Sequence, residues 1–346
     1  MSPDGAPPSR NPSATAAGRG AAVSPLRAAR FRFTLEAQAN IELTDFAGTV
    51  VRGGFGVAFK RTACPLRRQP CETCLLSASC VYLQVFETPA PEGGPLLPRG
   101  GKAPRPFVLE PPEEGHRFAP GDTFTVGLTL VGRAEAHLPY FVYAFRRLGE
   151  MGIGRGRGRY RLARLELHNP GEPPEPLLEG EGGRLVSGPY LEPLPPIPPV
   201  PAGGVGEGRV TVRYHTPMRL KEGGRYGARP TFPILVKHLL RRLSLLAACH
   251  EGRPPVLDHR AWIEAAGRVA TVAEELTWRD PERYSTRQRS RMRLGGWVGQ
   301  ATYAGPWEPF RPLLAAARLL HVGQGATFGH GRLTFAPHGA TSGGGP

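Results

Sequence analysis

The chain has 346 residues, which is long enough for two domains that each bury a core. Its 44 lysines and arginines outnumber 29 aspartates and glutamates, giving a net charge of +15 and a pI near 10.3. This excess, mostly arginine, points to a polyanionic partner, nucleic acid before membrane, with a generically basic composition as the alternative. The sequence contains no apolar run long enough to span a bilayer, which excludes a transmembrane helix.

Both ends of the chain are predicted to be disordered, over residues 1–27 and 339–346. The first 22 residues are mostly Pro, Ser, Gly and Ala, and they lack the apolar segment of a signal peptide. We therefore expect a cytoplasmic protein in a reducing compartment, where thiols stay free.

Residues 28–169 show the pattern of one small α+β domain. Phe31, Phe33 and Leu35 alternate with polar residues, which is typical of a half-buried strand. A helix is predicted over Phe46–Ala63, although its glycines weaken it. The later elements are strands at Val81–Phe86, Pro106–Leu109, Thr123–Val131 and Tyr160–Leu167 and a helix at Ala134–Gly149. The order β-α-β-β-α-β predicts a ferredoxin-like fold.

Four cysteines lie close together in residues 64–80, with the spacing Cys64-x6-Cys71-x2-Cys74-x5-Cys80. A Cys-x-x-Cys turn can place two thiolates on one ion, so these residues are candidate ligands of a structural metal, zinc before an iron–sulfur cluster. The outer spacings fit no standard zinc finger, which leaves unligated thiols or a reversible disulfide as alternatives.

Residues 170–208 are rich in Pro and Gly and are predicted to be a stiff linker that holds two domains apart. A second domain is predicted over residues 209–338, with the same order of elements. It begins with a strand at Arg209–Tyr214 and a strongly apolar helix at Phe232–His250. The remaining predicted elements are an insertion at Leu257–Leu276, a hairpin of Tyr284–Leu294 and Trp297–Tyr303, and a helix at Pro312–Leu320 before a last strand.

A glycine-rich loop follows the second helix of each predicted domain. A shift of 171 positions superimposes Gly152 on Gly323 and Gly154 on Gly325. Glycines at this spacing expose backbone N–H groups and admit a phosphate chain, although helix C-caps are the plainer interpretation. The first loop also carries arginines, so the repetition favours two copies of one nucleic-acid-binding domain.

Several motifs over residues 28–336 resemble one known family when they are taken together. They are Val51-Arg-Gly-Gly-Phe-Gly, Cys80-Val-Tyr-Leu-Gln-Val-Phe-Glu, Thr216-Pro-Met-Arg-Leu-Lys, Leu239-Leu-Arg-Arg-Leu-Ser-Leu-Leu, Tyr284-Ser-Thr-Arg-Gln, Gly295-Gly-Trp-Val-Gly and Gly323-x-Gly325-x3-Gly329-x-Gly331. The chain resembles the CRISPR-associated RAMP endoribonucleases that cut precursor CRISPR RNA within its repeats. The resemblance implies two tandem ferredoxin-like domains and metal-independent cleavage through a 2′-hydroxyl, leaving a 2′,3′-cyclic phosphate and a 5′-hydroxyl.

The chain departs from the common pattern of that family at the catalytic residue. Many members carry a catalytic histidine near the first helix, whereas this chain has no histidine before His116. Lys60 and Arg52 on the first helix and His330 in the glycine loop are therefore the catalytic candidates, with His215 and His238 as weaker ones; each is also compatible with an ordinary structural role. The RNA-binding candidates are Arg155, Arg157, Arg159, Arg219, Arg287, Gln288, Arg289, Gly323, Gly325 and Gly329.

Three functions agree with these patterns. The first is the processing endoribonuclease, with CRISPR repeat RNA as its partner and no small-molecule substrate. The second is a non-catalytic RAMP subunit that binds RNA among other CRISPR effector subunits, which would explain the missing histidine. The third is a metal-stapled RNA-binding protein outside CRISPR systems. The tandem domains favour the first two, and the Thr216–Leu220 and Tyr284–Gln288 motifs favour the first.

Overall fold

The computed structural model describes residues 26–44, 46–67, 69–88, 103–112, 117–180, 182–200, 207–252, 257–280, 282–285 and 290–338. The main sheet of the N-terminal half has the strand order β3-β5-β1-β6-β7. Its core elements are β1 (Arg27–Ala37), α1 (Ala47–Ala63), β3 (Phe107–Glu110), β5 (Thr123–Val131), α3 (Leu138–Met151) and β6 (Tyr160–Leu167). The sheet order confirms the predicted ferredoxin-like fold, because the first and third strands lie in the centre.

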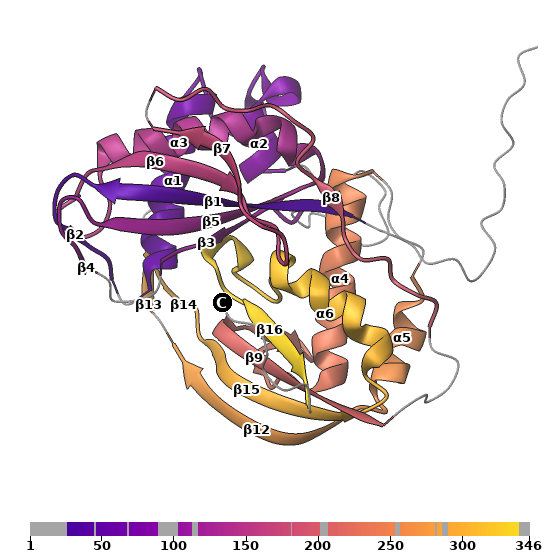
Figure 1. Ribbon diagram of the computed structural model, residues 1–346. Helices are drawn as coiled ribbons and strands as arrows, with labels where there is room; N and C mark the ends of the chain where they lie inside the picture. The colour runs from indigo at the N-terminus through magenta and orange to yellow at the C-terminus, as the bar shows by residue number, and fades with distance from the viewer. Residues whose placement is uncertain are drawn as a thin grey trace, which may run out of the picture.

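The alternation along β1 determines which face of this sheet is buried. Phe31, Phe33 and Leu35 are almost inaccessible to solvent and belong to the N-terminal core. On α1, Val51 and Phe55 lie one helical turn apart and enter the same core, where Phe55 stacks on Phe141 of α3 at a ring distance of 5.6 Å. The two helices therefore cover one face of the sheet (Figure 1).

The predicted strand at Val81–Phe86 is wrong, because these residues form a short helix, α2. An apolar run of six residues fits either a buried strand or a helix on periodicity alone. Here Tyr82 and Phe86 stack at 5.2 Å, one helical turn apart, and Phe86 packs on Phe59 of α1. The cysteine-rich insert before α2 contains two short 3-10 helices, η1 (Cys71–Thr73) and η2 (Ser77–Ser79).

The C-terminal half repeats the same topology, with the strand order β12-β15-β9-β16. Its elements are β9 (Gly208–Met218), α4 (Phe232–His250), α5 (His259–Ala266), β12 (Ala270–Arg279), β15 (Gly296–Gly305), α6 (Arg311–Leu320) and β16 (Leu333–Pro337). Helices α4 and α6 lie beside this sheet (Figure 1) and share its apolar core. Two tandem ferredoxin-like domains are thus confirmed.

The predicted hairpin of Tyr284–Leu294 and Trp297–Tyr303 is wrong in its pairing. β15 pairs with β12, which starts inside the predicted insertion, and Trp278 opposes Trp297 with their rings 5.2 Å apart. The intervening chain forms its own pair, β13 (Glu282–Ser285) with β14 (Ser290–Arg293). Strand pairing is decided here by aromatic contacts across the sheet rather than by the nearest glycine turn.

The segment predicted as a spacer makes contacts with both domains. β7 (Glu175–Glu179) extends the N-terminal sheet, and β8 (Glu192–Pro193) pairs with the beginning of β1. Beyond β8, Leu194 and Ile197 enter the core of the C-terminal domain. The two domains therefore pack on this segment instead of being held apart by it.

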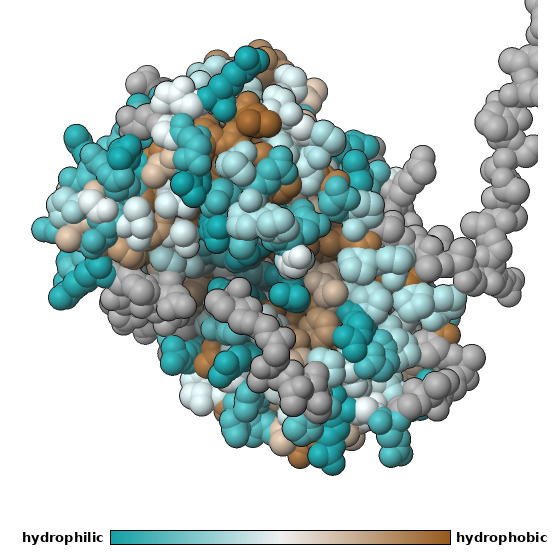
Figure 2. Space-filling model, viewed as in Figure 1, coloured by the Kyte–Doolittle hydropathy of each residue, from teal (hydrophilic) through white to brown (hydrophobic). Residues whose placement is uncertain are grey.

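The surface is mostly hydrophilic on the face shown in Figure 2. Among the helices that the structure describes, none has both the length and the apolar character needed to cross a membrane. The smaller strands that remain are β2 (Ile41–Glu42), β4 (Arg117–Phe118), β10 (Leu220–Glu222) and β11 (Arg225–Ala228).

Candidate nucleic-acid interface

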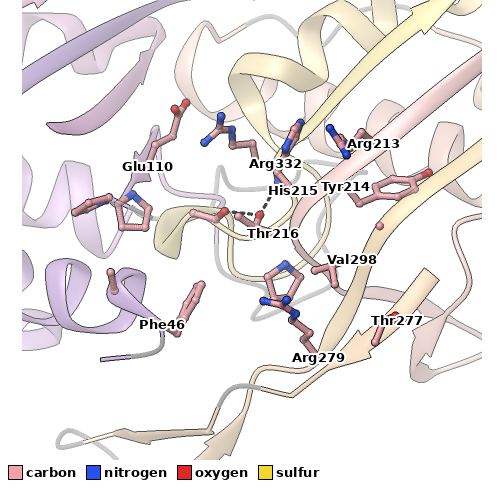
Figure 3. Close-up of a pocket in the computed structure, with 16 residues that line it drawn as sticks. Phe46, Glu110, Arg213, Tyr214, His215, Thr216, Thr277, Arg279, Val298 and Arg332 are labelled. Atoms are coloured by element: carbon pink, nitrogen blue, oxygen red, sulfur yellow. Dashed lines mark hydrogen bonds between the residues drawn. The ribbon is translucent and has the colours of Figure 1, made fainter. Parts of the chain in front are cut away.

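A pocket with a volume of about 550 Å³ lies between the two domains. The N-terminal domain contributes the start of α1 and the end of β3, and the C-terminal domain contributes β9, β12, β15 and the second glycine loop (Figure 3). Its polar lining residues are Glu110, Arg213, Tyr214, His215, Thr216, Thr277, Arg279 and Arg332. Three arginines and one carboxylate give the lining an excess of positive charge.

The alternation of β9 brings Arg213 and His215 to the pocket. Val212 and Tyr214 are buried in the C-terminal core, so the residues between and beyond them lie on the opposite, exposed face. In the described part of the chain, no carboxylate forms an ion pair with Arg213 or with Arg332. Both guanidinium groups are therefore available to an anion in the pocket.

The corresponding face of the N-terminal sheet is different, because its charges are paired within the protein. Arg30 bonds to Glu110, Arg32 to Glu166 and Arg161 to Glu36. The positive charge available for a polyanion is thus concentrated on the C-terminal side of the pocket.

The second glycine loop is attached to β9 by a set of short hydrogen bonds. The Thr216 hydroxyl donates to the Gly329 carbonyl (2.7 Å) and accepts from the Arg332 N–H (3.0 Å). The His215 N–H donates to the Arg332 carbonyl, and the Gly331 N–H to the Pro217 carbonyl. These bonds fix Arg332 beside His215, which explains the role of the Thr-Pro pair in the Thr216 motif.

His215 is the histidine that lines the pocket. Its Nε2 lies 2.7 Å from the Thr334 hydroxyl. Partial burial lowers the pKa of this imidazole, and the positive charges of Arg332 and Arg213 lower it further. The ring is therefore neutral near pH 7 and able to accept a proton.

Glu110 is the single carboxylate among the sixteen lining residues. Its Oε1 accepts from Arg30 Nε at 3.1 Å, and the Nε2 of buried His321 lies 3.7 Å from the same oxygen. Burial raises the pKa of Glu110, but the neighbouring His321 and Arg30 outweigh it and hold the pKa well below its usual range. The carboxylate is thus engaged by these two residues and offsets little of the pocket's charge.

Ala47, the first residue of α1, and its N-cap residue Phe46 also line the pocket. The first turn of this helix contains no acidic residue, and its N-cap residue Phe46 has no side-chain hydrogen bond to the helix N–H groups. A helix N-terminus carries a partial positive charge and free N–H donors, which add to the attraction for a phosphate.

The three predicted catalytic residues do not lie together in this pocket. Lys60 is 13 positions after Ala47 on α1, roughly 20 Å along the helix axis, and its ammonium lies 5.4 Å from the Tyr82 ring. Arg52 lies over the rings of Phe86 and Phe328, at 4.6 and 5.4 Å. It therefore joins α1 to the second glycine loop.

His330 lies in the glycine loop as predicted, but its side chain is completely buried. The ring packs edge-on against Phe46 at 4.5 Å, and neither ring nitrogen has a hydrogen-bond partner. Burial lowers the pKa of His330 to about 3, helped by the charges of His321 and Arg219. A neutral, inaccessible ring packs the two domains together and has no access to a substrate in this arrangement.

The predicted RNA-binding residues fall into two described groups. Arg155, Arg157 and Arg159 are exposed on the first glycine loop. The Arg155 N–H donates to the Glu42 carbonyl, and Glu42 is four residues before Phe46, so at most about 14 Å of chain separates this loop from the pocket. Arg287, Gln288 and Arg289 lie outside the described residues.

The second group surrounds the second glycine loop. Gly323, Gly325 and Gly329 have φ angles of 84°, 90° and 86°, a region that side chains rarely adopt. A Cβ at Gly323 would lie 2.6 Å from the carbonyl oxygen of Arg219, the residue between β9 and β10, so the glycine is needed for close packing of the loop there. Arg219 itself lies 4.6 Å from the ring of Tyr226.

The four thiols of the insert do not support the predicted metal site. Cys64 is buried, and Cys71, Cys74 and Cys80 are half-buried. Among the residues that the structure describes, no three potential ligands are arranged to hold one ion.

Arg213 and Arg332 were not singled out by the sequence patterns, and His215 ranked behind His330. The signal that finds Arg213 and His215 is the alternation Val210, Val212, Tyr214, which predicts that the residues between them are exposed on one face. Arg332 could not be found in this way, because its position depends on hydrogen bonds between distant segments.

Comparisons with known proteins agree with this architecture. The family model of the CRISPR-associated endoribonuclease Cas6 matches residues 212–333, and a model described as an N-terminal domain, AF_1859_N, matches residues 26–189. An uncharacterized protein of Archaeoglobus fulgidus is 25% identical over 292 residues, which cover 84% of this chain and 91% of that protein.

Solved structures of Cas6 have the same fold. A Cas6 product complex has a TM-score of 0.52 and Cas6 of Thermus thermophilus one of 0.50, each with 17% identity over 90% of this chain and 99% of that chain. At this identity the likeness shows the fold. The Cas6 endoribonuclease model thus matches the C-terminal domain, and the solved Cas6 structures share the tandem fold, in agreement with the resemblance found in the sequence.

Proposed function

We propose that the protein cleaves precursor CRISPR RNA within its repeats and that the scissile phosphate binds in the interdomain pocket. The observation that carries this proposal is the convergence of Arg213, Arg332 and His215 in one pocket of a Cas6-like tandem fold. Guanidinium groups suit the bidentate recognition of phosphate, and a neutral imidazole beside them can act on a hydroxyl.

In the proposed reaction the ribose 2′-hydroxyl attacks the adjacent phosphorus. His215 takes the proton of this hydroxyl, the 2′-oxygen bond to phosphorus forms, and the bond to the 5′-oxygen breaks. The leaving 5′-oxygen takes a proton from water, so the products are a 2′,3′-cyclic phosphate and a 5′-hydroxyl. Arg213 and Arg332 face the charge that develops on the phosphorane, where preorganised donors have their largest effect.

This assignment replaces the earlier candidates for physical reasons. His330 is buried and neutral, and Lys60 lies near the other end of α1. We propose that both residues support the fold around the pocket, and that no metal ion takes part in cleavage.

The test is incubation of the full chain with cognate repeat RNA in EDTA. We expect one cut and a cyclic phosphate end, and no cut when the 2′-hydroxyl upstream of the site is replaced by hydrogen. His215→Ala is expected to slow cleavage by about 10²- to 10⁴-fold with little loss of binding, since general base catalysis is worth that much. The matched control is His338→Ala, an exposed histidine of the same domain that does not line the pocket.

Two results would overturn parts of this proposal. If the His215→Ala variant cleaves the RNA as fast as the His338→Ala control, His215 takes no part in the reaction. Wild-type protein that binds repeat RNA tightly but never cuts it would instead support a non-catalytic RNA-binding subunit.

A further inference from the structure

A second surface with the chemistry of an RNA site lies on the short hairpin of β10 and β11. Gly223 and Gly224 connect the two strands and have φ angles of 54° and 82°. Positive φ at both central positions is the signature of a tight two-residue hairpin turn, whose twist matches the flanking strands. The hairpin therefore presents its side chains in one fixed arrangement.

Tyr226 is the exposed aromatic residue of this hairpin. Its side chain remains 48% exposed, although Arg219 lies 4.6 Å and Lys221 5.4 Å from the ring centre. Lys221 is its direct partner across the hairpin. Exposing an aromatic ring to water is unfavourable, so the exposed face of Tyr226 is suited to stacking on another ring. The two cations beside it add positive charge to the same surface.

The hairpin is rigidly attached to the domain. Leu220 is completely buried, and the imidazole of His238 on α4 lies within hydrogen-bond distance of the backbone of Lys221, 3.0 Å from its carbonyl. Lys237 on the same helix forms an ion pair with Glu222. His238, a weaker catalytic candidate from the sequence, thus holds the hairpin in place.

The hairpin is also continuous with the second glycine loop. The Arg219 carbonyl accepts a hydrogen bond from the N–H of Gln324, and Gly323 packs directly on that carbonyl. A strand of RNA that follows the loop would therefore meet Arg219 and then the ring of Tyr226.

We propose that Tyr226 is a stacking platform for one unpaired RNA base, with Arg219 and Lys221 contacting the phosphates on either side of that base. This inference deepens the proposed function and rests on it, because it places a single-stranded part of the bound RNA on the C-terminal domain. Stacking on an aromatic ring tolerates any base, while the neighbouring cations make the site dependent on salt.

The test compares two fluorescently labelled probes, a short oligoadenylate and a strand of the same length with abasic sugars. The second keeps every phosphate but has nothing to stack. Tyr226→Ala is expected to weaken binding of oligoadenylate by roughly 5- to 150-fold, as measured for other base–aromatic stacks, and to leave abasic binding unchanged. Tyr226→Phe should bind like the wild type, because the ring is retained.

The cationic part of the site has its own readout. Lys221→Ala is expected to reduce the slope of log affinity against log salt by about 0.7, the value for one contact with a single strand, whereas Tyr226→Ala leaves the slope unchanged. The matched control is Tyr143→Ala, which removes a 61% exposed tyrosine of α3 in the other domain and should change neither affinity nor slope.

The platform and the nuclease can fail separately. If Tyr226→Ala binds oligoadenylate as tightly as Tyr143→Ala does, or if wild-type protein does not distinguish the two probes, the platform is wrong even when repeat RNA is cut. If Tyr226 carries oligoadenylate binding but no repeat RNA is cut, the platform stands and the proposed cleavage fails.

Discussion

Two glycines of α1 allow a direct test of how the domains pack. A Cβ added at Gly48 would lie 2.0 Å from the carbonyl oxygen of Phe328, in the second glycine loop. A Cβ added at Gly53, five residues later on the same helix, would meet no atom within 4 Å. The same substitution, Gly→Ala, should therefore have opposite effects at these two positions.

The expected magnitudes follow from helix propensity and steric overlap. Alanine is favoured over glycine by about 1 kcal/mol inside a helix, so Gly53→Ala is expected to raise the free energy of unfolding by about that amount. Gly48→Ala gains the same propensity but must displace a backbone carbonyl of a loop that Thr216 fixes to β9. Overpacking of this kind costs about 1–3 kcal/mol or more, so the two variants should differ by roughly 1–3 kcal/mol.

Denaturant unfolding followed by circular dichroism measures this difference. Tryptophan fluorescence adds a domain-specific signal, because all four tryptophans, from Trp262 to Trp307, lie in the C-terminal domain. If the Gly48→Ala variant is as stable as Gly53→Ala, α1 does not closely contact the second glycine loop. The wall of the pocket that these two segments form would then be wrong as well.

Three further outcomes are expected. Because burial lowers the pKa of His330 to about 3, only the unfolded chain gains its proton between about pH 6.5 and pH 3, so stability falls on acidification. His330→Leu should reduce the slope of unfolding free energy against pH by up to about 1.4 kcal/mol per unit, and an unchanged slope would contradict the burial. Gly132→Ala should lower the melting temperature, since its Cβ would lie 2.6 Å from the His250 carbonyl of the other domain. The double variant Arg155→Ala with Arg157→Ala should reduce the slope of log RNA affinity against log salt by about 1.4. A slope equal to that of the wild type would show that neither arginine contacts a phosphate.

The fold was predictable because each domain repeats strong local patterns. Phe31, Phe33 and Leu35 show the period of a strand, and the apolar stripe of Phe232–His250 shows that of a helix. Two predictions failed where the local pattern was ambiguous. Val81–Phe86 is apolar enough for either state, and the partner of β15 is set by the contact between Trp278 and Trp297 rather than by a nearby turn.

The candidate site was less predictable, because it is made of segments that are far apart in the sequence. Glu110, His215 and Arg332 come from β3, β9 and the second glycine loop, and no periodicity relates them. The pattern of glycines located the second loop correctly, but it could not show that the loop packs against α1 and so buries His330. Whether a polar side chain is buried at a domain interface depends on how the two domains pack, and a local sequence pattern does not contain that information.

The two glycine loops show how one fold serves two purposes in this protein. In both, glycines with positive φ allow the chain to leave a helix, turn and return as a strand. The first loop faces solvent with Arg155, Arg157 and Arg159, whereas the second is enclosed between the domains and fixed to β9. The enclosed copy positions Arg332 within the pocket through its hydrogen bonds to Thr216 and Pro217, while the arginines of the first copy are exposed to solvent. In the proposed function, the fixed loop would hold Arg332 at the reacting phosphate, and the exposed loop would add phosphate contacts outside the pocket.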